Sequence, residues 1–343
     1  MSTANLDSAD LKGVQAGGLI REDVMNKIWD ISRIPLPFTD MIGTGSAKNE
    51  YKEWTTDELA APDVTNAVVD GSDASGNDTK TGARVGNHHQ ISDKVVRVSY
   101  RADASDTIGR AKELSYQLMR RQQELRRDVE AIALLNQASV ADDGDSVAGK
   151  AGGLPSWIET SAVNGTPGGF NLSTKLTEAY TYEAAAVGLT EKNVRDVVES
   201  VYNEGGDPTK MMTVPSIVRL FSEYLFTSSA RVASLMSDQG KSREKATALG
   251  SVNVFVTDFG TLTMVPNRLQ QTYTASTTAA DVFILDPEYL SLCYLKGYRT
   301  DPLAKTGLAE NRQMCVDWSL IVNTEKAHGI ITSIDTTAAV TAS

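Results

Sequence analysis

The stretch YQLMRRQQELRRDVEAIALLNQ, Tyr116–Gln137, decides the fold, because its spacing predicts one long amphipathic helix. At about 100° per residue, a set of apolar side chains falls in one narrow sector: Leu114, Leu118, Leu125, Val129 and Ile132. No proline interrupts the run, so we expect a helix from about Arg110 to Gln137. At 1.5 Å per residue such a helix is roughly 42 Å long, which is enough to span a domain. Towards Leu135 the sequence becomes apolar all round, so that end should be the more deeply buried.

Four arginines stand out on this helix, because the chain as a whole is acidic. Its formal charge is −11, with 33 Lys and Arg against 44 Asp and Glu. Arg120 and Arg127 lie opposite the apolar stripe, and the i,i+4 spacing predicts Arg120–Glu124 and Arg126–Glu130 pairs along the helix. The arginines therefore form either a solvated outer face or a surface that meets another chain.

Composition argues against several classes of function. An acidic chain is a poor general binder of nucleic acid, because attraction to phosphates needs a positive surface. Cys293 and Cys315 lie inside apolar runs and are expected to be reduced and packed. The first residues lack the basic and apolar regions of a signal peptide, and no apolar run approaches a membrane-spanning length. We therefore expect a soluble protein, made in the cytoplasm, without membrane contact.

The first hundred residues predict an arm and a projecting hairpin. Residues 1–20 are polar and glycine-containing, which indicates a mobile arm, and a helical spacing then continues until the prolines of 35–37. Residues 50–63 begin as a strand, and 88–102 are rich in β-branched side chains. Between them, 68–86 are dense in Gly, Asp, Ser and Thr and cannot bury a core. This pattern predicts a long hairpin whose end projects from the body.

Beyond the long helix, the pattern predicts mixed helices and strands. Helices are expected at 173–186, at 191–202 with Thr190 as the N-cap, and at 216–226. Strands are expected at 210–215, in a hairpin over 251–267, and at 281–287, 312–323 and 326–334. The last residues, 335–343, are expected to fray.

Motifs for catalysis or metal binding fail on inspection. Gly144–Lys150 has the glycine–lysine spacing of a phosphate-binding loop, but Ala151 stands where that loop needs Ser or Thr, and a helix precedes it instead of a strand. His88 and His89 are adjacent in an expected strand, so they point to opposite faces and cannot bind one metal; the other histidine is His328. We therefore expect no enzyme activity, no catalytic residue, no metal and no cofactor.

The order of the parts is specific: arm, projecting hairpin, long helix, mixed α/β region and closing antiparallel strands. It resembles the major capsid (major head) proteins of tailed bacteriophages, which share the α+β HK97 fold. The resemblance covers about Gly18 to Ile334. It is carried by GLIREDVMNKI and IPLPFTDMIG, YKEWTTDEL, NHHQISDKVVRVSYRADAS, QELRRDVEAIALL, GGLPSWI, ILDPEYLSLCYL, LAKTG and VDWSLIVNTEKAHGII, in colinear order.

The resemblance implies the names and boundaries of the parts. They are the N-arm, 1–46; the E-loop, 47–101; the spine helix and P-domain, 102–206; the A-domain, 207–285; closing P-domain strands, 286–335; and a tail, 336–343. It implies a structural protein that self-assembles as hexamers and pentamers into the icosahedral capsid of a virion. That shell would enclose double-stranded DNA without sequence-specific binding and be assembled in the host cytoplasm.

The partners implied are copies of the chain itself, a portal protein and, where one is used, a decoration protein. A separate scaffolding protein is expected, because no long charged helical region precedes the arm. Two other interpretations stay open. One is an encapsulin-type cellular nanocompartment shell on the same fold, which would hold cargo enzymes. The other is a soluble enzyme with an unrecognised site, such as a dispersed carboxylate pair.

In relatives of this fold the E-loop lies across a neighbouring subunit near its spine helix. Here the hairpin between Glu50 and Asp78 carries many carboxylates and, as its one cation in that range, Lys52. A guanidinium can bind a carboxylate through two parallel hydrogen bonds, so we expect arginine–carboxylate contacts between subunits. The candidate residues are Arg120, Arg121, Arg126 and Arg127 on the helix and Glu53, Asp57, Glu58 and Asp63 on the loop.

Overall fold

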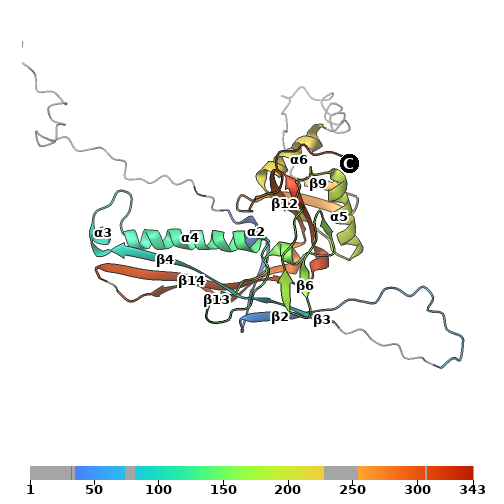
Figure 1. Ribbon diagram of the computed structural model, residues 1–343, viewed down its shortest axis with the longest axis horizontal. Helices are drawn as coiled ribbons and strands as arrows, with labels where there is room; N and C mark the ends of the chain where they lie inside the picture. The colour runs from blue at the N-terminus through green and yellow to red at the C-terminus, as the bar shows by residue number, and fades with distance from the viewer. Residues whose placement is uncertain (1–31, 33–34, 74–81, 228–253, 306, 343) are drawn as a thin grey trace, which may run out of the picture.

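The computed structural model describes residues 32, 35–73, 82–227, 254–305 and 307–342 of the chain. Figure 1 shows a long helix, α4, lying along an extended sheet, with a rounded lobe at one end of the sheet. Residues 57–73 leave the molecule as a thin arm on the side of the lobe away from α4 (Figure 1).

The extended sheet has four strands in the order β1-β13-β14-β4. These are β1 (Gly43–Ser46), β13 (Leu290–Pro302), β14 (Ala309–Val322) and β4 (Gln90–Ser99). β13, β14 and β4 are antiparallel neighbours, and β1 runs parallel to β13. α4 (Glu113–Ala133) packs against β4 and β14, which gives the helix a flat platform along its length.

The predicted long helix is confirmed, with shorter ends than the expected 110–137. At the start, Lys112 has an extended backbone. At the end, the amide of Leu135 donates to Ile132 and that of Gln137 to Leu135, which are not the i−4 hydrogen bonds of an α-helix. Four of the five expected stripe residues pack in the core, namely Leu118, Leu125, Val129 and Ile132, and Ala133 joins them. The C-terminal end is the more deeply buried, as its sequence predicted.

The lobe is built on a seven-stranded sheet with the path β5-β15-β12-β8-β10-β9 and β11 paired to β12. The strands are β5 (Ala162–Val163), β8 (Lys210–Thr213), β9 (Val254–Thr257), β10 (Gly260–Pro266), β11 (Tyr273–Thr274), β12 (Thr278–Leu285) and β15 (Gly329–Asp335). The strand and hairpin predictions for this region are confirmed, including the β9–β10 turn at Asp258. Along β12, Val282 and Ile284 face one core cluster and Phe283 and Leu285 the other, so both faces of this strand are covered.

Two helices complete the lobe, α5 (Glu191–Asn203) and α6 (Pro215–Thr227). Thr190 caps α5 as expected, since its side chain accepts from the amide of Asn193 at 3.0 Å. The buried face of α5 is the predicted valine stripe of Val194, Val197, Val198 and Val201. α5 therefore owes its position to a local cap and one apolar face.

The projecting hairpin is confirmed at its base, where β2 (Tyr51–Thr56) pairs antiparallel with β3 (Ala83–His88). Residues 57–73 follow β2, are exposed throughout, and form the arm visible in Figure 1. The end of the predicted hairpin, 74–81, and the predicted N-terminal arm up to residue 31 lie outside the described residues.

The helix expected at 173–186 is wrong. That region begins with a small hairpin of β6 (Gly169–Asn171) and β7 (Leu176–Glu178). The side chain of Asn171 accepts from the backbone amides at 173 and 174, and Lys175 has φ 59°, a turn conformation that a helix does not contain. Local turn chemistry therefore outweighs the weak helical pattern.

The expected fraying of the C-terminal residues is also wrong for those that the structure describes. The amide of Thr341 donates to the carbonyl of Leu189, and the carbonyl of Thr341 accepts from the amide of Glu191. Val340 is buried in the core cluster of the lobe. These contacts hold the end of the chain beside the start of α5.

Candidate functional site

The N-terminal half of α4 carries Arg120 and Arg121, both half-buried. Arg120 donates to the hydroxyl of Tyr116 at 3.3 Å. Glu124, the expected partner of Arg120, lies 2.5 Å from Arg121 in an i,i+3 pair. Part of this arginine charge is thus used along the helix itself, as the interpretation of a solvated face requires.

Arg126 and Arg127 differ in their surroundings. Arg126 is exposed, and its guanidinium lies over the ring of Tyr298 in β13 at 5.3 Å. Arg127 is half-buried, and its Nε has no hydrogen-bond partner among the described residues. The predicted Arg126–Glu130 pair is wrong, because the Glu130 carboxylate is buried and used elsewhere.

Glu130 has a structural role that the sequence analysis missed. Its Oε1 accepts from the amide of Phe38 and from the side-chain amide of Asn267, both at 2.8 Å. Its Oε2 accepts from the amide of Thr39 at 2.7 Å and from the Thr39 hydroxyl. Phe38 and Thr39 belong to α2 (Pro37–Met41), so Glu130 ties the chain that enters from the N-terminal segment to α4. The available signal was that Glu130 directly precedes the apolar run 131–135, the end of the helix expected to be the more deeply buried, where an unpaired carboxylate is costly.

Two of the four candidate carboxylates have cation partners in their own chain. Glu53 forms an ion pair with Arg84 of β3. Glu58 lies 2.9 Å from the Nζ of Lys326, which is 268 residues away in sequence. Neither pair was expected, because ion pairs between distant segments leave no periodic pattern in a sequence.

The other two candidate carboxylates are exposed and make local turns. Asp57 accepts from the amide of Glu58 at 2.9 Å. Asp63 accepts from the hydroxyl and the amide of Thr65, and these hydrogen bonds hold the pKa of the Asp63 carboxyl below its usual range. Among the described residues, neither aspartate forms an ion pair with a cation.

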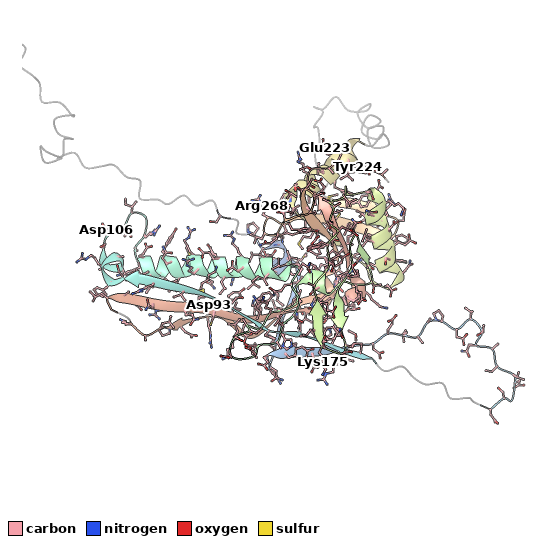
Figure 2. The ribbon with its side chains drawn as sticks, viewed as in Figure 1. Asp93, Asp106, Lys175, Glu223, Tyr224 and Arg268 are labelled. Carbon is pink, nitrogen blue, oxygen red and sulfur yellow. The ribbon has the colours of Figure 1, made fainter. Side chains whose placement is uncertain are left out.

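One subunit does not bring the arginines and the carboxylates together. The arm leaves the lobe on the opposite side from α4 (Figure 1). In Figure 2, Asp106, in the connection that precedes α4, and Lys175, beside the β2–β3 hairpin, mark the two sides. A contact between these two sets of residues therefore requires two copies of the chain.

The arm also exposes large apolar side chains, which the sequence analysis missed by attending to its charges. Leu59 is 94% exposed, Val64 95%, Val68 82% and Val69 79%. Apolar side chains this exposed, and this close in sequence, are typical of a surface that another protein covers.

The side chains that could bind a metal are dispersed in the described part of the chain. No cluster of three His, Cys, Asp or Glu side chains there could hold a metal ion. His88 lies against the ring of Tyr51, whereas His89 faces Asp317, as expected for neighbours pointing to opposite sides. None of the helices described is both long and apolar enough to cross a bilayer.

Comparisons with known proteins agree with this architecture. Residues 3–335 match the family model described as SU10 major capsid protein. A major capsid protein of Escherichia phage Phieco32 is 28% identical over 215 residues, which cover 54% of this chain and 61% of that protein. The chain thus spans about three fifths of that relative's length.

Solved structures share the fold at low sequence identity. The capsid of a native GTA particle has a TM-score of 0.60 and 13% identity, covering 96% of this chain and 99% of its own. The SrpI encapsulin of Synechococcus elongatus PCC 7942 has a TM-score of 0.56 and 12% identity, covering 95% and 97%. The fold is therefore the α+β fold of HK97-type capsids and encapsulins.

Proposed function

We infer that this chain, which belongs to the SU10 major capsid protein family, is the structural protein of a phage head. The observation that carries this inference is the arm, whose exposed apolar side chains no part of the described subunit covers. Burying one Leu or Val side chain contributes roughly 1.5–3 kcal/mol. A neighbouring copy that covers Leu59, Val64 and Val68 would therefore gain association energy that the isolated subunit cannot.

We propose that the copies close into hexamers and pentamers of an icosahedral shell. The arm and the surface that receives it are different parts of the chain, so each contact is head-to-tail and generates a ring when the rotation closes. Many modest contacts within a closed lattice add to a stable shell. Double-stranded DNA inside would be held by confinement, since the net charge of −11 disfavours binding to phosphates.

The contact between subunits would join the E-loop carboxylates Glu53, Asp57, Glu58 and Asp63 to a neighbour's Arg120, Arg121, Arg126 and Arg127. Asp57 and Asp63 suit this role best, because both are exposed and have no cation partner among the described residues. On the receiving side, Arg126 is exposed, whereas Arg127 is half-buried and its Nε lies out of contact with solvent. Each exposed pair contributes only about 0–1 kcal/mol, so these contacts would set the register of the arm.

Further partners follow from the same proposal. A closed shell that takes up DNA needs an opening, which a portal protein would form at one vertex. We propose a separate scaffolding protein and, where one is used, a decoration protein that binds the outer surface of the shell. Assembly would take place in the host cytoplasm, with the finished protein in the virion.

An encapsulin-type shell is the second candidate, favoured by the structural likeness to SrpI encapsulin. The family match over residues 3–335 favours the phage head instead. The contents of particles made in a cell distinguish the two, because an encapsulin would contain co-purifying cargo protein whereas a phage head would fill with DNA when the other phage components are present.

Electron microscopy and sedimentation of the full chain, expressed with a scaffolding protein, test the proposal. We expect closed shells and free capsomers. Monomers alone at high protein concentration with the scaffold supplied would refute the proposed function, and turnover of a small molecule by such monomers would favour an enzyme.

A further inference from the structure

Three distant segments of the chain meet at Lys326. This residue lies in η4 (Glu325–Ala327), the short connection between β14 of the extended sheet and β15 of the lobe. Its Nζ is 2.9 Å from a carboxylate oxygen of Glu58, at the start of the E-loop arm, and 2.8 Å from one of Glu204, at the end of α5. We call this three-residue contact, Glu58–Lys326–Glu204, the clasp.

The side of the clasp that belongs to the body is rigid. A Cβ added to Gly206, just beyond α5, would lie 2.9 Å from the Cα of Ala327, so the two backbones are in close contact there. Next to Lys326, the carboxylate of Glu325 accepts from the amide of Thr160 at 3.0 Å and from its hydroxyl at 2.5 Å. η4 is thus held on two sides by the body of the subunit.

The arm side of the clasp borders open space. Glu58, Glu204 and Lys326 all line a groove of about 840 Å³ between the base of the arm and the body. Leu59 of the arm and Leu172 of the body also line this groove, and both are largely exposed. Packing against the body therefore does not fix the direction of the arm here. The ion pair between Lys326 and Glu58 is the contact that can fix it.

Charge explains why one lysine serves two carboxylates. Hydrogen bonds from the ammonium group, the stronger effect from Glu204 and the weaker from Glu58, raise the pKa of Lys326 to about 12. The lysine therefore stays charged at every physiological pH. If Glu58 moves away, Glu204 still pairs with Lys326, and no unpaired cation is left against the body. Glu58 is therefore the member that can leave at little cost.

We propose that Lys326 sets the direction in which the E-loop arm leaves the subunit and so presents the arm to a neighbouring copy. This inference rests on the proposed function, since it makes Lys326 a positioning residue for shell assembly. An exposed or half-buried ion pair of this kind shifts the ratio of aligned to free arms by up to about 5-fold, equivalent to about 1 kcal/mol. When a neighbour's arginine takes Glu58, the clasp opens and Glu204 keeps Lys326 in place.

The orientation of the arm can be measured on the dilute, unassembled full chain. A fluorophore is attached at Val68→Cys in a Cys315→Ser background, since Val68 is exposed and Cys293, the other cysteine, is buried. We expect Lys326→Met to lower the fluorescence anisotropy and Lys326→Arg to restore it. Lys192→Met is the matched control and should change nothing, because Lys192 forms an exposed i,i+4 pair with Asp196 at the start of α5, the opposite end of that helix from Glu204.

Assembly gives the second readout, measured as the initial rate of shell formation by light scattering, with the substitutions at Lys326 and Lys192 made in the unlabelled chain that keeps Val68. We expect a several-fold slower rate for Lys326→Met at low salt, recovery in Lys326→Arg, and no difference from wild type near 1 M salt, where exposed charges are screened over about 3 Å.

The outcomes separate this inference from the proposed function. Unchanged anisotropy in Lys326→Met overturns the clasp whether or not shells form. Lower anisotropy with an unchanged assembly rate overturns the positioning role and leaves the proposed function standing. Absence of shells from the wild-type chain overturns the proposed function, and with it the assembly role of Lys326.

Discussion

Replacing Glu130 by Gln tests how the N-terminal segment is attached to α4. The carboxylate of Glu130 is completely buried and accepts four hydrogen bonds, two at each oxygen. Glutamine has nearly the same shape but turns one of these oxygens into an NH2 group. The new NH2 group then faces two donors. These are the donors of Phe38 and Asn267 if it replaces Oε1, or the amide and hydroxyl of Thr39 if it replaces Oε2.

The magnitude follows from these partners. A buried donor left without an acceptor costs about 1–3 kcal/mol, and hydrogen bonds to a charged group are the stronger kind. The Thr39 hydroxyl can turn and accept from the new NH2 group, which relieves one of its two conflicts. We therefore expect Glu130→Gln to cost roughly 2–4 kcal/mol locally, a large share of the 5–15 kcal/mol typical of a folded domain.

Hydrogen exchange at the amides of Phe38 and Thr39 is the direct assay, because both amides donate to Glu130. A loss of about 2 kcal/mol corresponds to roughly 30-fold faster exchange. The matched control is Glu124→Gln on the same helix, where the carboxylate has a partly exposed pair with Arg121. That variant should exchange at these amides as the wild type does and lose at most about 1 kcal/mol of stability.

Equal exchange rates in Glu130→Gln and Glu124→Gln would refute this reasoning, since α2 would then be held by the packing of Phe38 and not by the carboxylate. A stability loss without faster exchange at residues 38 and 39 would equally count against it, because it would place the damage elsewhere.

Three further predictions concern assembly and pH. Reversing Arg120 and Arg127 to Glu should leave the chain folded, as judged by circular dichroism, but assembling poorly, with partial rescue by Asp57→Lys; normal heads from the double reversal would contradict the proposed contact. Val64→Ser, at a 95% exposed position, should leave the unfolding temperature unchanged and raise the protein concentration needed for shell formation; an unchanged threshold would show that the arm is not buried there. Burial raises the pKa of Asp281 from 3.8 to about 6, so its stabilising contribution is complete below about pH 3.8 and is lost as the pH rises through 6. Asp281→Asn cannot ionise, so the stability difference between this variant and the wild type should change in the variant's favour by up to roughly 3 kcal/mol from pH 4 to pH 7, whatever the variant loses in its hydrogen bonds with Tyr182 and Tyr273; parallel pH profiles in denaturant unfolding would contradict this.

Where the sequence predicted structure correctly, the signal was local. α5 has its cap at Thr190 and its apolar face at a regular spacing, so both causes lie within a dozen residues. The same holds for the β9–β10 hairpin, where two β-branched runs flank a turn at Asp258. Periodicity and turn chemistry act over short distances, and a single sequence displays both.

The helix expected at 173–186 failed through local turn chemistry, but other predictions failed because of a partner far along the chain. The C-terminal residues are held because Thr341 bonds with Leu189 and Glu191. Glu130 looked like one half of a helical ion pair, yet its partners lie 91 to 137 residues away. Single-sequence spacing carries no information on such contacts, so it misplaces charged residues that tertiary structure recruits.

Charged and apolar side chains of the arm contribute unequally to the proposed contact between subunits. The sequence pointed to carboxylates on the arm, but Glu53 and Glu58 already have cations in their own chain, and a neighbour's arginine must compete for them. Exposed ion pairs contribute about 0–1 kcal/mol each, whereas each buried Leu or Val contributes roughly 1.5–3 kcal/mol. The apolar side chains at 59, 64, 68 and 69 therefore supply most of the association energy that the arm can offer. Charge then decides which neighbour and which register the arm accepts, because a carboxylate placed against another carboxylate is penalised while an apolar contact tolerates sliding.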